Sequence, residues 1–249
     1  MSQKIAFITG ANRGIGFQTA LDLAPHGVAS LIGSRDLASG HRAVEKLRAA
    51  GVQAEAILFD ITNPAHHLAA HDYLAQHWGR LDILVNNAGI AAGDGTFPPV
   101  GPAHKASELP LDELRRVMET NFFAQVALTQ TLLPLLRLSP AGRIVNLSSI
   151  LGSQTLHAEP KSPIYSAKSF AYDVSKTALN SLTIHLAYEL RDTTIKVNSA
   201  HPGWVKTDMG GPHATMDLAE GAKTSVQLAT LPNDGPTGGY FHLGKPLPW

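Results

Sequence analysis

The chain has 249 residues, of which 44% are hydrophobic and 16% charged, and its 20 basic residues balance its 20 acidic ones. This size and composition are typical of a soluble α/β protein, and the balanced charge gives no global field that would attract nucleic acid or an acidic membrane. The chain has no cysteine, which excludes disulfides and thiolate catalysis. No signal-peptide pattern or apolar run of membrane-spanning length is found, so we expect a cytoplasmic protein.

Short apolar runs typical of strands alternate with longer helical patterns along the chain. The expected strands span residues 4–9, 28–33, 54–60, 81–89, 142–149, 195–203 and 238–243. The expected helices span residues 14–26, 37–50, 64–79, 111–137, 171–191 and 214–230. Pro134 should kink or end the fourth of these helices. Residues 90–110 and 150–170 show no clear pattern and are expected to be loops.

Continuous apolar strands that alternate with helices favour a parallel sheet covered on both faces. No repeat, low-complexity tract or linker divides the chain. We therefore expect a single Rossmann-type, doubly wound α/β domain over residues 1–249. Its mostly parallel central sheet should have about seven strands, flanked by helices.

The first expected strand ends in the glycine-rich segment TGANRGIG, residues 9–16. Glycines at 10, 14 and 16 stand between a strand and a helix, which is the setting of a dinucleotide-binding turn. Small residues there let backbone amides approach a pyrophosphate at the helix N-terminus. Taken alone, the turn is equally consistent with a tight connection that binds nothing.

The end of the second expected strand, Ser34-Arg35-Asp36, bears on which dinucleotide would bind. An acidic residue at this place binds the ribose hydroxyls of NAD, whereas an arginine suits the 2′-phosphate of NADP. Asp36 is also a natural N-cap for the helix from Leu37. With Arg13 near the same edge, two arginines favour NADP, and an NAD-preferring site that uses Asp36 is the alternative.

The segment YSAKSFAYDVSK, residues 165–176, holds two tyrosines that each precede a lysine. Tyr165 precedes Lys168 in a stretch expected to be a loop, so their spacing need not place them on one face. Tyr172 and Lys176 are four residues apart in an expected helix, where a phenol and an ammonium share a face. The sequence therefore favours Tyr172 and Lys176 as the functional pair, and Tyr165 as a residue that lines the substrate pocket.

These features resemble the short-chain dehydrogenase/reductase family over nearly the whole chain. The matching segments are TGANRGIG (9–16), FDI (59–61), NNAG (86–89), TNFF (120–123), IVNLSS (144–149), AYDVSK (171–176) and HPGWVKTDM (201–209). The segment PGWVKTDM and the ending PLPW are similar to the carbonyl-reductase branch. The resemblance implies reversible, NADPH-dependent reduction of a ketone or aldehyde to an alcohol.

The resemblance also implies which residues carry the reaction. The family's catalytic group corresponds to Asn121, Ser149, Tyr172 and Lys176, and Ser149 fits better than its neighbour Ser148. For NADP(H) it implies the glycine turn, the ends of three strands, the catalytic helix and the loop after the sixth strand. These cofactor residues are Gly10, Asn12, Arg13, Gly14, Ile15, Gly16, Arg35, Asp60, Ile61, Asn87, Ala88, Gly89, Tyr172, Lys176, Pro202, Gly203, Val205 and Thr207.

The chemistry of carbonyl reduction explains why a tyrosine and a lysine are paired. A free phenol has a pKa of about 10, which makes it a weak acid at neutral pH. An ammonium at about 4 Å would lower that pKa by roughly three units before solvent screening. We therefore expect Tyr172 to be the general acid and Lys176 to lower its pKa and to bind the ribose. Ser149 would donate to the substrate oxygen, and Asn121 would hold a helix backbone and a water that relays protons to Lys176.

The chain departs from the family pattern between the catalytic serine and tyrosine. Ser149 and Tyr172 are 23 positions apart, where about a dozen is common in the family. In the carbonyl-reductase branch a larger insertion at this place accompanies a monomeric state. The insertion here is shorter, so both a monomer and a homo-oligomer stay open. The substrate pocket should involve residues 90–110, the insertion at 150–170 and residues near 205–216.

Two other hypotheses come from different classes of protein. A non-catalytic NADP-binding module could keep the glycine turn and serve as a sensor or interaction partner. His67 and His71, four apart on an expected helix, have a spacing that can bind zinc. No third ligand is evident nearby, so we expect no metal and a solvated helix face. Trp204 and Trp249 could close the pocket, although C-terminal packing is the favoured role of Trp249.

Overall fold

The computed structural model describes residues 3–93 and 105–249, which contain a sheet of eight strands. The strands are β1 (Lys4–Thr9), β2 (Val28–Ser34), β3 (Ala54–Leu58), β4 (Ile83–Asn86), β5 (Arg143–Leu147), β6 (Lys196–Ala200), β7 (Tyr240–His242) and β8 (Lys245–Pro246). They lie in the order β3-β2-β1-β4-β5-β6-β7-β8, and only β7 and β8 pair antiparallel. The expected fold class is confirmed, with a short β8 added after the seven expected strands.

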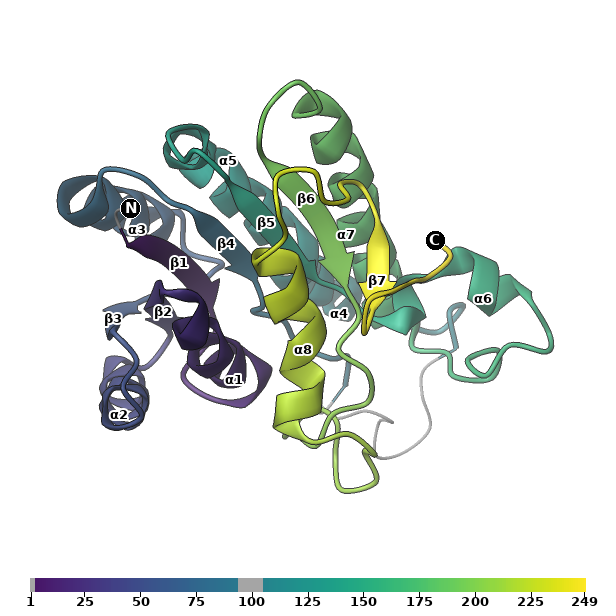
Figure 1. The fold of residues 1–249 in the computed structure, drawn as a ribbon. Helices are drawn as coiled ribbons and strands as arrows, with labels where there is room; N and C mark the ends of the chain where they lie inside the picture. Colours follow the sequence, from purple (N-terminus) through teal and green to yellow (C-terminus); the bar gives the residue numbers. More distant parts are fainter. Residues whose placement is uncertain (1–2, 94–104) are drawn as a thin grey trace.

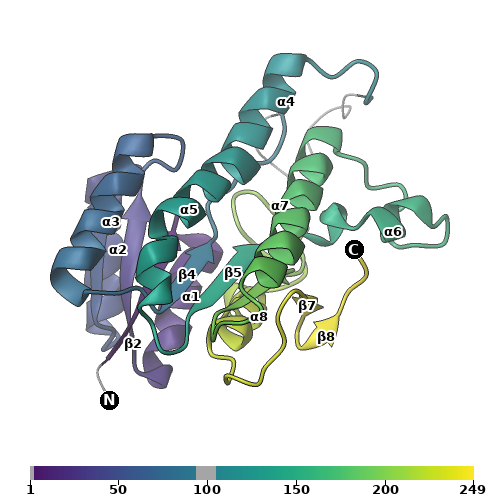
Figure 2. The ribbon, with the colours of Figure 1, turned by 90° about the horizontal axis from the view of Figure 1, so that it is seen from above.

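Helices cover both faces of the sheet, as the continuously apolar strands predict. The longer helices are α1 (Gly14–Leu23), α2 (Leu37–Ala49), α3 (Pro64–Trp78), α4 (Leu111–Met118), α5 (Ala124–Arg137), α7 (Phe170–Glu189) and α8 (Leu218–Ala229). Figures 1 and 2 show α1 and α8 on one face and α3, α5 and α7 on the other. Each face has its own buried apolar cluster.

The strand order places the candidate site. The chain proceeds outward from β1 to β3, then returns to the other side of β1 to form β4 and the later strands. Ligands of open α/β sheets bind at the carboxyl ends of the strands on either side of such a reversal. Here those ends are the glycine turn after β1 and the segment Asn87–Gly89 after β4, both taken from the sequence as cofactor residues.

The expected helix over 111–137 is divided in a way that the sequence did not predict. It consists of α4, a π-helical segment η2 (Glu119–Phe123) and α5. Pro134 lies inside α5 and does not end it, since α5 continues to Arg137. A π-helical turn places one extra residue in the helix and often occurs at functional sites. Here it contains Asn121.

The insertion at 150–170 contains more regular structure than a loop. A 3₁₀ turn, η3 (Ile150–Gly152), and a short helix, α6 (Gln154–Ala158), precede α7. Ser149 and Ser153 accept hydrogen bonds from the first turns of these elements. The C-terminus lies beside α6 (Figure 1), where the amide of Thr155 donates to the carbonyl of Trp249 at 2.8 Å. A further 3₁₀ turn, η1 (Ala24–His26), follows α1.

Among the residues that the structure describes, no helix is long and apolar enough to cross a membrane. Most of the expected loop at 90–110 lies outside the described residues.

Candidate active site

The four predicted catalytic residues come from three segments that meet around the first turns of α7. Lys176 is 4% exposed, and its ammonium donates to the carbonyl of Leu147 at the end of β5, at 2.8 Å. The same Nζ atom lies 5.6 Å from the centre of the Tyr172 ring. The phenol and the ammonium therefore share a face of α7 at the carboxyl end of β5, as their four-residue spacing predicts.

Asn121 ties the π-helical turn to two other parts of the site. Its Oδ1 accepts from the amide of Ile90 at 2.8 Å, while its Nδ2 donates to the carbonyl of Ile90 at 2.9 Å. Nδ2 also donates to the Oγ of Ser175 on α7 at 3.0 Å. The backbone that Asn121 holds is thus the segment after β4, in place of the helix backbone that we expected.

The two serines after β5 differ in their surroundings. Ser149 is half-buried, and its side chain hydrogen-bonds Tyr172, which favours the ionised phenol. Ser148 is buried, and its side chain interacts with the phenol of Tyr240 on β7 instead. The contact with Tyr172 supports Ser149 as the serine of the site, as the sequence favoured.

The pKa values of the pair differ from our expectation. Burial raises the pKa of Tyr172 to about 12, the charge of Asp173 adds to this, and the Ser149 hydrogen bond opposes it. Burial lowers the pKa of Lys176 to about 8. The expected depression of the phenol pKa is therefore wrong for the protein alone, because desolvation outweighs the lowering effect of the Ser149 hydrogen bond.

The glycine turn has backbone conformations and close contacts that favour glycine. Gly10 and Gly14 have φ angles of 64° and 61°, in the region that favours glycine. A Cβ on Gly16 would come within 2.6 Å of the Nδ2 of Asn87. Arg13 is the N-cap of α1 and makes no side-chain capping bond. The backbone can thus approach a ligand closely at this helix N-terminus.

The segment after β4 braces this turn. Asn87 donates from Nδ2 to the carbonyl of Thr9 at 2.7 Å, and the amide of Ala88 donates to the Thr9 hydroxyl at 2.9 Å. A Cβ on Gly89 would lie 3.3 Å from Oδ1 of Asn121 and 3.5 Å from Nζ of Lys176. The predicted cofactor residues at 87–89 therefore connect the glycine turn to the predicted catalytic group.

The charged side chains near the predicted cofactor edge differ in their contacts. Asp36 accepts from the amides of Ala38 and Ser39 at 3.2 and 3.0 Å, so its predicted role as the N-cap of α2 is confirmed. Arg13 forms an exposed ion pair with Asp208. Arg35 is exposed at the end of β2.

Asp60 is held by its own turn. Its Oδ1 accepts from the amide and the hydroxyl of Thr62 at 2.9 and 2.8 Å. Burial would raise the pKa of Asp60, but these bonds and the nearby charge of Arg35 keep it below its usual value. Arg35 therefore faces the same corner as Asp60 and its neighbour Ile61, where the adenosine end of the cofactor was predicted.

The loop after β6 reaches back over the glycine turn. Gly203 has a φ of 88°, and a Cβ there would overlap the sulfur of Met216. Val205 forms a β-bridge with Met216, and the Thr207 methyl lies 3.7 Å from the position of a Cβ built on Gly14. The predicted nicotinamide segment, which begins at Pro202, thus faces the predicted phosphate site.

The second tyrosine–lysine pair has a structural arrangement of its own. Tyr165 is 45% exposed in the turn region before α7, and the Lys168 ammonium lies 5.0 Å from the centre of its ring. The loop that we expected here is confirmed, and the contact is a cation–π interaction. Tyr165 is not shown to line a pocket, and that role stays a prediction.

Two neighbours of the candidate site were given no role in the sequence analysis. His201 accepts at Nδ1 from the amides of Ile150 and Gly203, at 3.1 and 3.4 Å, and so joins the segment of the predicted catalytic serine to the loop after β6. Tyr240 is buried on β7 close to Ser148, and its ring stacks on Trp249 at 5.5 Å. The packing role favoured for Trp249 is confirmed.

The expected solvated helix face is wrong for His67 but not for the partly exposed His71. His67 is buried, and its Nε2 donates to the carbonyl of Ile61 at 2.6 Å. His71 contacts Asp72 at 3.0 Å. No group of three or more metal-ligating side chains occurs in the described ranges.

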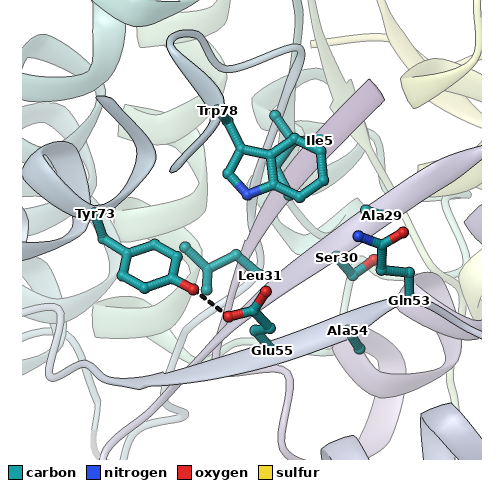
Figure 3. A pocket seen from close by; sticks show the side chains of 9 residues that line it. All are labelled: Ile5, Ala29, Ser30, Leu31, Gln53, Ala54, Glu55, Tyr73 and Trp78. Carbon is teal, nitrogen blue, oxygen red and sulfur yellow. Dashed lines mark hydrogen bonds between the residues drawn. The ribbon is translucent and has the colours of Figure 1, made fainter. Parts of the chain in front are cut away.

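A shallow hollow lies elsewhere, where α3 packs on the first half of β1 and on β2 and β3 (Figure 3). Its lining includes Trp78 and Tyr73, whose phenol hydrogen-bonds Glu55. None of the predicted site residues lines it. The hollow is therefore separate from the candidate site.

Comparison with known proteins identifies the family. The family model described as short chain dehydrogenase matches residues 4–217. The chain is 35% identical to carbonyl reductase (NADPH) 1 of Mus musculus, with 100% of this chain and 99% of that protein covered. It is 34% identical to carbonyl reductase (NADPH) 3 of Rattus norvegicus, with 93% and 92% covered. The chain belongs to the short-chain dehydrogenase family, as its motifs indicate.

Solved structures agree with this assignment. The NADPH-bound carbonyl reductase from chicken fatty liver superposes with a TM-score of 0.81 at 29% identity, and all of both chains is covered. Carbonyl reductase Sniffer of D. melanogaster gives the same TM-score at 28% identity, again over both full chains.

Proposed function

We propose that this protein is an NADPH-dependent carbonyl reductase that converts a ketone or aldehyde to an alcohol and can act in reverse. The observation that carries the proposal is the meeting of Tyr172, Lys176, Ser149 and Asn121 beside an open glycine turn. The full-length relatives named as NADPH carbonyl reductases support the same activity.

The cofactor preference rests on charge at the adenosine end. Arg35 is exposed after β2 and Arg13 is exposed at the start of α1, whereas Asp36 caps α2. A 2′-phosphate would gain charge-assisted hydrogen bonds from a guanidinium there. Asp36, the residue that an NAD-preferring site would use, has both carboxylate oxygens committed to backbone amides.

The glycine turn and the segments facing it fit the rest of NADP(H). Backbone amides at the start of α1 would hold the pyrophosphate, and Asn87 to Gly89 would lie along the ribose. Pro202, Gly203, Val205 and Thr207 would hold the nicotinamide end. When bound, NADPH supplies the hydride that reduces the carbonyl carbon.

Proton delivery falls to the chain's own side chains. Tyr172 would donate the proton that the carbonyl oxygen needs as it gains negative charge, and Ser149 would donate a hydrogen bond to the same oxygen. Lys176 would stabilise the phenolate that remains and bind the ribose. A positively charged neighbour favours the phenolate, so the phenol pKa should fall when Lys176 is protonated and the oxidised cofactor is bound.

Consumption of NADPH with a panel of aldehydes and ketones tests the proposal. A carbonyl reductase should oxidise NADPH with at least one of these compounds and form the matching alcohol. NADPH binding without turnover of any of them would favour a non-catalytic binding module. The proposal includes a small-molecule substrate and a cytoplasmic location. Light scattering of the purified protein decides between a monomer and a homo-oligomer.

A further inference from the structure

Three ionisable side chains meet between the insertion and the first turn of α7. The Lys168 ammonium donates to the carbonyl of His157 at 2.9 Å and lies 3.1 Å from its Nδ1. His157 Nε2 lies 3.4 Å from the Oδ2 of Asp173. Asp173 directly follows Tyr172, so this cluster joins α6 to the residue next to the predicted acid.

The contacts fix the protonation of His157. Its Nδ1 accepts from the ammonium of Lys168, and its Nε2 lies 2.9 Å from the carbonyl of Leu151, to which it must donate. A neutral imidazole with its proton on Nε2 satisfies both contacts. Burial lowers the pKa of His157 and the charge of Lys168 acts in the same direction, which agrees with a neutral ring.

Asp173 is the buried carboxyl group of the cluster. Its side chain is almost fully buried, and its Oδ2 accepts from the amide of Ser169 at 2.9 Å. Its Oδ1 has no hydrogen-bond partner among the described residues. Burial raises the pKa of Asp173 to about 7, although the Ser169 bond and the charge of Lys168 oppose this rise.

The charge of Asp173 acts on Tyr172. It contributes to the raised pKa of the phenol, after burial. The ionisable groups around Asp173 are His157 from α6, Lys168 from the preceding turn, and Tyr172 and Lys176 from α7 itself. The 3₁₀ turn η3, which also packs on α7, carries no ionisable side chain. On α4, Asp112, Arg115 and Arg116 are exposed.

We propose that Asp173, bonded to the amide of Ser169 and flanked by His157, is a positioning residue for Tyr172 whose negative charge keeps the proton on the phenol. The inference deepens the proposed function and rests on it. It also gives the insertion a role. The helix α6 and the turn before α7 fix the start of α7 and the position of the Asp173 charge beside Tyr172. A carboxylate here disfavours the phenolate, which extends the pH range over which Tyr172 can serve as an acid.

Substitution of Asp173 by asparagine tests this role, because it removes the charge and keeps the size and an acceptor for the Ser169 amide. The rates of carbonyl reduction and of alcohol oxidation are measured against pH, with kcat and KM separated. In the variant, the rate of carbonyl reduction should fall off on the alkaline side at a pH lower than in the wild type, by about half a unit or more. Oxidation should begin at a correspondingly lower pH, while the KM for NADPH stays unchanged.

Two further variants separate charge from general disturbance. Glu159→Gln removes an exposed carboxylate from the same insertion and should leave both pH profiles at the wild-type position. Asp173→Ser also removes the buried charge and replaces the asparagine variant if that protein does not fold. A profile that stays in place in the folded Asp173 variant, or moves equally in Glu159→Gln, would overturn the inference.

The same measurements distinguish failure of this inference from failure of the proposed function. Full turnover by a Tyr172→Phe variant would contradict both the proposed function and the role of Asp173. Turnover that depends on Tyr172, combined with an unmoved alkaline limit in Asp173→Asn, would leave the proposed function in place and reject only the role of Asp173.

Discussion

Lys176 and Tyr172 lie one helical turn apart on α7, with the ammonium of Lys176 5.6 Å from the centre of the phenol ring and bonded to the carbonyl of Leu147. The bond to Leu147 fixes the ammonium at the end of β5, so the helix and the sheet together set its position. Burial raises the pKa of the phenol and lowers that of the ammonium. Both changes favour the uncharged forms, and a bound cofactor and substrate must supply the polarity that the reaction needs.

The cofactor preference can be tested at Arg35. Arg35→Ala should weaken NADPH binding by roughly 10- to 100-fold, because a charge-assisted hydrogen bond to the 2′-phosphate contributes about 1.5–3 kcal/mol. Binding of NADH, which lacks this phosphate, should change little. Titration of both cofactors by fluorescence measures the two dissociation constants.

Arg42→Ala is the matched control for Arg35, since Arg42 is an exposed arginine on α2 that pairs with Asp36 at 3.7 Å. It should leave the preference for NADPH unaltered. Tighter binding of NADH than of NADPH by the wild-type protein would contradict the assignment and favour the NAD-preferring alternative.

Asn121 should matter to both stability and turnover. Asn121→Ala removes two hydrogen bonds to Ile90 and one to Ser175, and we expect the free energy of unfolding to fall by about 2–4 kcal/mol. The turnover number should fall as well, since Ile90 and the adjoining Gly89 would lose their support. Urea denaturation and steady-state kinetics measure the two effects.

Ser175→Ala provides the comparison for Asn121, because it removes the bond between Asn121 and Ser175 and leaves both hydrogen bonds between Asn121 and Ile90 in place. Its loss of stability should be the smaller of the two. An Asn121→Ala protein as stable and active as the wild type would show that the π-helical turn does not support the site.

The buried carboxyl of Asp173 should make stability depend on pH. Its pKa rises from 3.8 in the unfolded chain to about 7 in the folded protein, so the folded state binds the proton more tightly. The protein should therefore lose stability as the pH rises from about 4 to 7, and the loss is complete above the folded value. The rise in pKa corresponds to roughly 4 kcal/mol.

Asp173→Asn removes this titration. The free energy of unfolding of the variant minus that of the wild type should be larger at pH 8 than at pH 4, by a few kcal/mol. Urea denaturation of both proteins at the two pH values measures the difference. A difference between the proteins that is the same at pH 4 and pH 8 would exclude a raised pKa at Asp173.

Much of the fold could be predicted because its determinants are local. Apolar runs the length of strands alternate with helical patterns, and the glycines and Asp36 mark the points where strands give way to helices. The π-helical turn could not be predicted, since its 5 residues have no period that separates them from the flanking α-helices. The tertiary contacts of Asn121 with Ile90 and Ser175 accompany it, and these lie far away in the sequence.

The residues of the candidate site also fall into those that could be predicted from local sequence and those that could not. Tyr172 and Lys176 were found because their four-residue spacing lies in an expected helix, which places them on one face, and because they match the family's catalytic group. The sequence did not reveal Asp173, His157 or His201, because their importance depends on burial and on partners from other elements. The direction of the Tyr172 pKa was misjudged for the same reason: the presence of Lys176 one turn away can be inferred from spacing, whereas the burial that raises the phenol pKa cannot.

The measurement that tests the central claim most directly is NADPH oxidation by the wild-type protein, Tyr172→Phe and Tyr165→Phe, with the same carbonyl compound. We predict turnover by the wild type, a loss of roughly 100-fold or more in Tyr172→Phe with NADPH binding retained, and turnover close to that of the wild type in Tyr165→Phe. Full activity in Tyr172→Phe, or an equal loss in Tyr165→Phe, would contradict the assignment of Tyr172 as the acid.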